Sequence, residues 1–283
     1  MMTNDDFLAA VHDANFAMLC ELDRVCRENR IRYYLLAGTL LGAVRHKDFI
    51  PWDDDVDVVF PRKDYERFLE IFPEKCNERY KLIRFEDNKK FRTFINRVVD
   101  TGLMLETVDN WESSFDSVYS HPTVDLFIFE NAPRHITPVL VFLKFVYGLT
   151  FSRRERVDND QKTALRRMAV KLLAFIGKVF PYSFLCRLYT GTCAFINKKA
   201  KGSPYWFISN EQYKPPYWGK LYKKEWFKKT GKHRIRDRYF PGASDADAQL
   251  SMIYGDYMKI PDESGRAPLH FKRVVSEKKA QEG

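Results

Sequence analysis

The sequence predicts an α+β fold: a mixed sheet flanked by helices, followed by a largely helical and basic C-terminal part. Short apolar runs bounded by glycine or acidic residues, such as 55–60 and 123–129, are typical of buried strands. Longer stretches with apolar residues at every third or fourth position, such as 5–29, are typical of helices. With 283 residues, of which 45% are hydrophobic, the chain is long enough to bury a substantial core.

The N-terminal elements follow from these patterns in order. Residues 5–29 carry a helical stripe that Thr3 or Asn4 can cap, and a short strand over 31–37 ends at Gly38. A turn then leads into a short helix ending at Arg45, and Pro51 lies in a loop before the next strand. The remaining elements are a strand over 55–60, a helix over 62–72, weak strands over 80–85 and 91–99, and a stronger strand over 123–129.

The second half differs in composition. Residues 136–151 are strongly apolar but shorter than the roughly 20 residues that a membrane span needs. Residues 163–180 alternate apolar side chains with Lys and Arg, which suits a helix lying on an anionic membrane surface and equally a helix covering the sheet. Residues 205–239 are aromatic and basic, with Pro215 and Pro216 in a loop. We expect the polar tail after Phe271 to be frayed. The predicted parts are 1–135, a core, and 136–283, which completes the site.

Charge and cysteine content indicate which partners the chain can bind and in which cellular compartment it folds. The net charge of +9 divides into −8 over residues 1–133 and +17 over 134–283, so the first part can hold metal ions and the second can attract anionic partners. The five cysteines are scattered, which argues for reduced thiols in the cytoplasm and against a structural zinc site. The acidic start lacks the features of a secretory signal. We therefore expect a cytoplasmic protein, either free or peripheral on the inner face of the membrane.

Four carboxylates lie within five positions, directly before an apolar run, in the segment Asp53-Asp54-Asp55-Val56-Asp57. On a strand, Asp55 and Asp57 share one face while Val56 points into the core. Two close carboxylates repel each other unless a cation lies between them, and oxygen-only ligands favour Mg²⁺ or Mn²⁺. The alternative is a solvated acidic turn, although surface turns rarely run straight into an apolar strand.

A further acid, Asp125, lies inside the apolar run 123–129, where a charge must be paired, bound to metal or directed into a cleft. Together with the glycine turn at Gly38 and Thr39, the paired acids and Asp125 follow an order that resembles the nucleotidyltransferase superfamily. That resemblance implies a nucleotidyltransferase-like sheet in which Asp55, Asp57 and Asp125 bind metal. Asp125 would act as the third ligand or as the general base, and the sequence leaves this choice open.

The resemblance narrows to one family, the LicD family of phosphocholine transferases and their relatives, which include the fukutin-related ribitol-phosphate transferases. Three blocks carry it: residues 36–58, the segment Val124-Asp125-Leu126-Phe127, and residues 254–261 followed by His270. The first block is long and specific. The resemblance says little about residues 138–238.

The family resemblance implies transfer of a phospho-alcohol group, such as phosphocholine, from a CDP-activated donor to a hydroxyl of a cell-surface glycan or its lipid-linked precursor, with release of CMP. Asp55 and Asp57 would hold Mg²⁺ or Mn²⁺ against the donor diphosphate. The candidates for binding the donor are Gly38, Thr39, Arg45, His46 and Arg97, because backbone amides and Arg side chains suit phosphate oxygens. We expect Trp52 to pack under the acidic loop and His270 to make a structural hydrogen bond.

Two other classes of function remain open from the sequence. A nucleotidyltransferase proper would use the same acids to transfer NMP from an NTP to a small molecule, a protein or an RNA end. A non-catalytic binding module would dock its basic, aromatic second half on a membrane or on nucleic acid, with steep salt dependence in the latter case. The acids at Asp55, Asp57 and Asp125 argue against the binding module, and we expect no nucleic-acid partner.

Overall fold

The computed structural model describes residues 4–87, 93–107, 120–151, 163–210, 219–268 and 270–277. The chain forms two compact units. Unit 1 contains residues 1–83, 96–129 and 222–283, and unit 2 contains residues 84–95 and 130–221. The longer segment of unit 2 begins at residue 130, close to the predicted boundary at 135, but residues 222–283 join the first unit instead of continuing the second.

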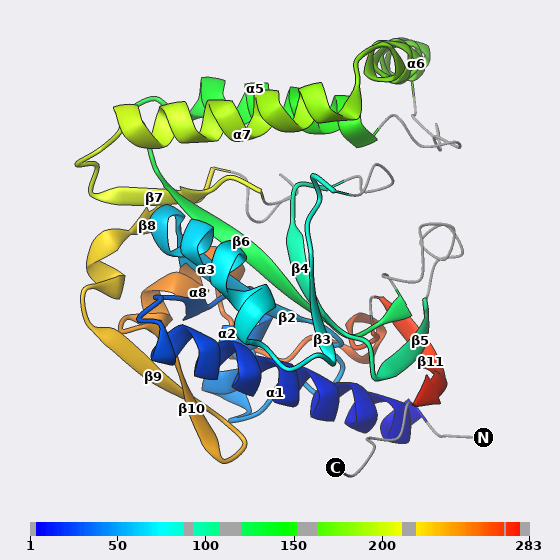
Figure 1. Ribbon diagram of the computed structural model, residues 1–283, viewed down its shortest axis with the longest axis vertical. Coiled ribbons are helices and arrows are strands. Elements are labelled where there is room, and N and C mark those ends of the chain that lie inside the picture. Colours follow the sequence, from blue (N-terminus) through cyan, green and yellow to red (C-terminus); the bar gives the residue numbers. More distant parts are fainter. Residues whose placement is uncertain are drawn as a thin grey trace. The chain divides into compact units, whose positions relative to one another are not determined.

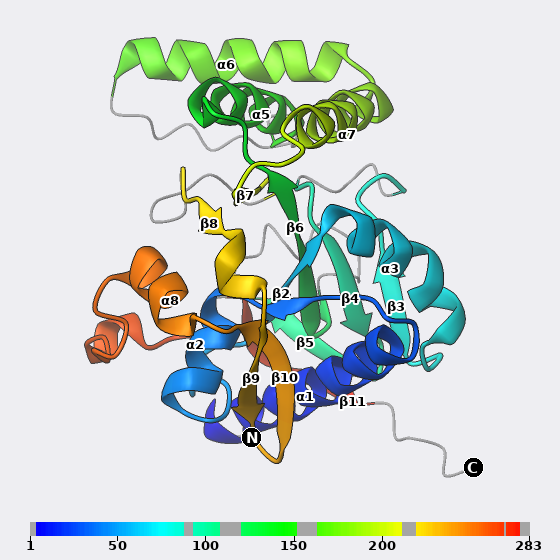
Figure 2. The same cartoon turned by 90° about the vertical axis from the view of Figure 1, so that its left-hand side faces the viewer.

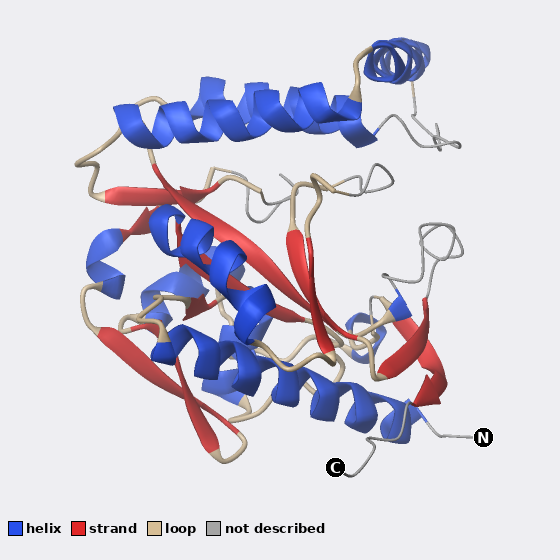
Figure 3. Ribbon diagram, viewed as in Figure 1, coloured by secondary structure: helices blue, strands red, loops and turns tan. Residues whose placement is uncertain are grey.

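Unit 1 is built on a mixed sheet with the strand order β1-β2-β6-β4-β3, which bears out the predicted α+β class (Figures 1 and 3). Only β2 and β6 run parallel, and the other neighbours along this path are antiparallel. The strands are β1 (Tyr34–Leu35), β2 (Val56–Pro61), β3 (Tyr80–Ile83), β4 (Asn96–Asp100) and β6 (Thr123–Asn131), of which the first seven residues of β6 belong to unit 1. The parallel pair β2–β6 aligns Asp57 with Asp125.

Helices α1 (Asn4–Glu28) and α3 (Arg62–Lys75) pack against each other and against this sheet. The predicted apolar stripe of α1 is fully buried at Val11, Met18 and Leu22, so these side chains form part of the core. Helix α2 (Ala37–Arg45) packs on β2 and contacts α8 (Ala246–Tyr254) and β9 (Thr230–Ile235). Strand β9 forms a hairpin with β10 (Arg238–Ala243), and β8 (Tyr222–Lys223) is a further short strand.

Two local predictions need correction. The strand expected over 31–37 is limited to Tyr34 and Leu35, and Gly38 and Thr39 lie inside the first turn of α2 instead of in a preceding turn. Ala37 has a positive φ of 44°, which turns the chain directly from the strand into the helix. The weak strand expected over 91–99 begins in residues that lie outside the described ranges, and β4 forms at its C-terminal end.

Residues 271–277 of the polar tail form a strand, contrary to our expectation of a frayed end, and residues 278–283 lie outside the described residues. Strand β11 (Phe271–Glu277) pairs antiparallel with β5 (Leu103–Thr107), and a small apolar cluster joins both strands to α1. Phe271 is 4% exposed in that cluster, together with Phe7 and Val11 of α1. The sequence did not indicate this strand for two reasons: the tail is polar in composition, and its partner strand, β5, lies far away in the sequence.

Unit 2 is largely helical, as expected for this part of the chain. Its helices are α5 (Ile136–Phe151), α6 (Ala164–Val179) and α7 (Tyr182–Lys199), and it also contains β7 (Tyr205–Ile208). Helix α5 packs on both α6 and α7, and Figure 2 shows α6 lying across the other two. Phe94, from the short segment 84–95, stacks on Tyr189 of α7 with ring centroids 3.8 Å apart, which ties the two chain segments of this unit together.

Candidate active site

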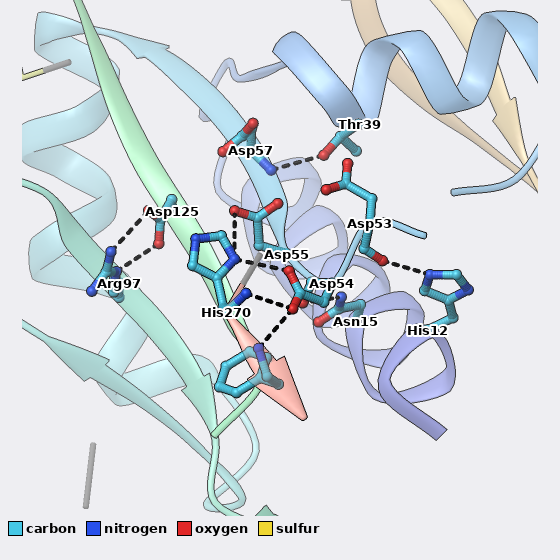
Figure 4. Close-up of polar contacts among 11 residues, drawn as sticks. His12, Asn15, Thr39, Asp53, Asp54, Asp55, Asp57, Arg97, Asp125 and His270 are labelled. Carbon is cyan, nitrogen blue, oxygen red and sulfur yellow. Dashed lines mark hydrogen bonds and ion pairs between the residues drawn. The ribbon is translucent and has the colours of Figure 1, made fainter. Parts of the chain in front are cut away.

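Charged side chains from three adjacent strands of unit 1 form a row across the sheet (Figure 4). Asp57 on β2 is in register with Asp125 on β6, and Asp125 is in register with Arg97 on β4. Residues paired in this way point to the same face of a sheet. Arg97 holds the Asp125 carboxylate with two hydrogen bonds, from Nε to Oδ1 at 2.7 Å and from Nη2 to Oδ2 at 3.2 Å. The structure therefore places Asp125, the third predicted acid, beside Asp57 of the predicted pair, together with the guanidinium of Arg97.

The predicted alternation across β2 is present. Val56 and Val58 are 0% exposed in the core, whereas Asp55 and Asp57 lie on the opposite face. Figure 4 also shows the Asp53 carboxylate directed toward the same space as those of Asp55 and Asp57. Asp53 was not among the predicted site residues, although its place in the acidic run was a signal that could have identified it.

The first turn of α2 positions two of these acids. A Cβ atom at Gly38 would lie 2.5 Å from Oδ2 of Asp53, so the absence of a side chain gives that carboxylate its place. The hydroxyl of Thr39 accepts a hydrogen bond of 2.8 Å from the backbone N–H of Asp57, which fixes the start of β2. Gly38 thus leaves room for the Asp53 carboxylate, and Thr39 fixes the backbone of Asp57. Both residues also lie at a helix N-terminus, which favours a bound anion.

Asp54 has a different role from its neighbours because it is fully buried and binds the C-terminal segment. It accepts hydrogen bonds of 2.9 Å from the backbone N–H groups of His270 and Phe271 and one of 2.8 Å involving His270 Nδ1. The same Nδ1 lies 3.7 Å from Oδ2 of Asp55. His270 therefore joins the acidic cluster, and its predicted structural hydrogen bond is made to a residue that our sequence reasoning had not singled out.

Helix α1 holds the backbone of the acidic loop in place. The ring Nε2 of His12 lies 2.7 Å from the carbonyl oxygen of Asp53, and the side-chain amide of Asn15 donates to the carbonyl of Asp54 at 3.3 Å. Burial is the main cause that lowers the pKa of His12, which favours the neutral imidazole with a proton on Nε2. Because both contacts are made to backbone carbonyls, they do not engage the carboxylate of Asp53.

The cluster concentrates carboxylates in a half-buried place. Burial raises the pKa of Asp57 well above its usual value, and the carboxylates of Asp55, Asp125 and Asp53 raise it further. Burial likewise raises the pKa of Asp55 to about 6, against the opposing effect of His270. Burial alone would lower the pKa of His270, but the charges of Asp55, Asp54 and Asp125 outweigh it and raise that pKa to about 10. Such a site favours an added positive charge.

The donor set fits a hard divalent cation, because carboxylate oxygens are the ligands that Mg²⁺ and Mn²⁺ prefer. Within the described ranges, no three His, Cys, Asp or Glu side chains form a ready-made set of ligands. The carboxylates available to a cation are those of Asp55 and Asp57, with Asp53 beside them, since both oxygens of Asp125 accept hydrogen bonds from Arg97.

Two of the predicted donor-binding residues lie elsewhere on α2. Arg45 and His46 are at its C-terminal end, opposite to Gly38 and Thr39. The Arg45 guanidinium donates to the carbonyl of Tyr257 at 2.9 Å and lies 5.9 Å from the centre of the Trp52 ring. The guanidinium of Arg266 lies 5.6 Å from the centre of the same ring, and Trp52 itself packs against the hydrophobic core of unit 1. Arg45 thereby joins two of the sequence blocks described above, and its role in donor binding stays a prediction.

Comparison with known proteins identifies the family that this chain resembles. Residues 30–155, which include Asp53–Asp57 and Asp125, match the family model described as LicD/FKTN/FKRP, nucleotidyltransferase domain. The chain is 26% identical over 259 residues to the lipopolysaccharide cholinephosphotransferase LicD of Haemophilus influenzae, a match that covers 88% of this chain and 91% of the relative.

Two shorter matches cover smaller parts of the chain. An uncharacterized protein of Rickettsia typhi is 37% identical over 59 residues, which are 21% of this chain and 19% of that protein. The ribitol 5-phosphate transferase FKRP of Homo sapiens is 64% identical over 28 residues, which are 10% of this chain and 6% of the transferase.

Proposed function

Because the chain belongs to the LicD family, we propose that it is a transferase that moves a phospho-alcohol group from a CDP-activated donor to a hydroxyl of a cell-surface glycan or its lipid-linked precursor, releasing CMP. The names of its relatives describe transfer of phosphocholine and of ribitol phosphate, which share this chemistry. The observation that carries the proposal is the half-buried cluster of Asp53, Asp55 and Asp57, in which Asp57 is aligned across the sheet with Asp125 and Arg97.

In this proposal, Asp55 and Asp57 hold Mg²⁺ or Mn²⁺, with Asp53 beside them. The bound cation supplies charge neutralisation of the donor diphosphate. The chain itself supplies orientation: Thr39 fixes the backbone of Asp57, Gly38 makes room for Asp53, and His270 with Asp54 holds the other side of the loop. In the same proposal, the amides at the start of α2 would bind a phosphate oxygen, since a helix N-terminus favours an anion.

Asp125 is the candidate that receives the proton of the acceptor hydroxyl. Both of its oxygens accept hydrogen bonds from Arg97, so this role requires the acceptor hydroxyl to compete with the guanidinium for one of them. Without such an exchange, the Arg97–Asp125 ion pair acts electrostatically beside Asp57. In either role, Arg97 acts by positioning Asp125.

We also propose that the reaction takes place in the cytoplasm. None of the five cysteines forms a disulfide, and Cys26 is buried as a thiol. Buried thiols that stay reduced are typical of proteins that fold in a reducing compartment.

The direct test is a donor screen with the purified chain, a glycan extract as the acceptor, and Mg²⁺ or Mn²⁺. CDP-choline, CDP-ribitol, CDP-glycerol and CDP-ethanolamine are compared with CTP. We expect metal-dependent CMP release from at least one CDP-alcohol and none after chelation. Release of pyrophosphate from CTP alone would favour the nucleotidyltransferase alternative, and the absence of nucleotide products with every donor would overturn the proposal.

A further inference from the structure

Helix α6 of unit 2 exposes an apolar stripe directly opposite its packed side. Leu165, Met168, Leu172, Phe175 and Val179 are each between 58% and 72% exposed. At about 100° per residue, they fall within roughly a quarter of the helix circumference. Gly177, on the far side of the helix, is buried. An ordinary helix that covers a core has the reverse arrangement, with its apolar side inward.

The neighbouring helices of the bundle expose similar side chains. Within the described ranges, 17 large apolar residues are exposed, and eleven of them lie between positions 141 and 195. Besides the α6 stripe, these eleven are Val141, Phe142 and Phe145 of α5, Phe180 in the α6–α7 link, and Phe184 and Phe195 of α7. We call this set of eleven side chains the apolar face of unit 2. Exposed apolar side chains gathered in this way indicate an interaction surface.

The charges on the same helices are all of one sign. Helices α5, α6 and α7 contain eight Lys and Arg residues and no Asp or Glu. Arg167, Lys171 and Lys178 are exposed along one flank of the α6 stripe. A second copy of this surface would bring cations against cations, which is unfavourable. A bilayer with anionic headgroups would satisfy both the apolar stripe and the basic flank.

The geometry favours a helix that lies on a membrane rather than one that crosses it. Within the ranges that the structure describes, no helix alone has the length and hydropathy of a membrane span. Residues 167–179 and 182–199 reach that threshold only as a pair, with a 100° bend between them. In Figures 1 and 2, no other described helix or strand of unit 2 lies over the outward side of α6.

We propose that the apolar face of unit 2 docks on an anionic lipid bilayer, with the stripe of α6 in the headgroup region and Arg167, Lys171 and Lys178 against the lipid charges. Docking of this kind would hold the chain beside lipid-linked acceptors, but the binding itself does not depend on the proposed reaction. It is therefore tested without turnover.

The experiment is flotation of the full chain with vesicles of pure phosphatidylcholine and with vesicles of equimolar phosphatidylcholine and phosphatidylglycerol. We expect binding to the anionic vesicles and much weaker binding to the neutral ones. L172S/F175S removes two exposed apolar side chains and should weaken binding by about tenfold or more. Replacing Lys171 or Lys178 by Ala should weaken it about fivefold per charge. The matched control is Y239S, an exposed aromatic of unit 1 that should leave binding unchanged.

Sedimentation of the same proteins without lipid tests the alternative, that a second copy of the chain covers the apolar face of unit 2. A monomer that floats with anionic vesicles supports the proposal, provided that its far-ultraviolet circular dichroism is unchanged by L172S/F175S. A dimer that L172S/F175S dissociates, without flotation of the parent chain, would assign the face to a second copy and overturn the proposal. Flotation that L172S/F175S leaves unchanged would also overturn it.

Discussion

Asp57 faces three other carboxylates, from Asp53, Asp55 and Asp125, and each of them opposes its ionisation in addition to burial. Its backbone is nevertheless fixed by Thr39, and its strand neighbours Val56 and Val58 are fully buried. Such a residue contributes little to stability as an anion, since its charge is costly in the folded state. Its conformation is therefore more easily explained by function than by folding.

From this we predict that Asp57→Asn lowers turnover by about a thousandfold or more while the fold stays intact, because it removes a proposed cation-binding charge without a change in size. CMP release and the urea midpoint are measured on the same preparations. The control is Asp48→Asn, an equally conservative change at an exposed ion pair with Arg236, which should leave both unchanged. Near-normal turnover of Asp57→Asn would contradict the assignment of this residue.

The elements that the sequence predicted best are those whose periodicity is local. Helix α1, strand β2 and strand β6 lie within two residues of their predicted bounds, because a buried stripe or an alternating face is visible in a short window. Helix α7, helix α8 and the hairpin β9–β10 were not predicted, and β11 was expected to be frayed. Strand β11 is stabilised by pairing with β5 and by burial of Phe271 against α1, and neither partner is close in sequence.

For β11 we predict that Phe271→Ala lowers the free energy of unfolding by about 3 kcal/mol, since it removes a buried ring from the cluster around Phe7 and Leu103. Turnover should fall as well, because the Phe271 N–H and His270 hold Asp54. Urea unfolding gives the first effect and CMP release the second.

The matched control on the same strand is Val275→Ala, since Val275 is 57% exposed and its truncation should change stability by less than about 0.5 kcal/mol. Equal destabilisation by the two variants would mean that the anchoring cluster does not stabilise this strand.

At the scale of the whole molecule, each unit is assembled from separate chain segments. Unit 2 unites residues 84–95 with 130–221 through the stacked rings of Phe94 and Tyr189 and a hydrogen bond of 2.8 Å from the Tyr182 hydroxyl to the Phe85 carbonyl. Unit 1 likewise needs residues 222–283 to complete its acidic site through His270. A division of the chain at one point near 135 could not describe either unit.

This assembly predicts that Tyr189→Ala destabilises unit 2 by about 4 kcal/mol, because the buried ring leaves a cavity beside Phe94. Hydrogen exchange should show faster exchange in α5 and α7, whereas amides of β2 and β6 in unit 1 keep their protection. Phe195→Ala, on the exposed side of the same helix, is the control. Equal loss of protection in β2 would show that the two units unfold together.

The sequence by itself determined the site's central pair, since the alternation of Asp55 and Asp57 with buried valines follows from strand geometry alone. It also indicated Asp125 as a charge that needed a partner. Only the tertiary structure decided which partner: Arg97, 28 positions away on β4. The same holds for His270, which reaches Asp54 across 216 positions. Local periodicity reports which face of an element is buried, but it carries no information on which distant element covers that face.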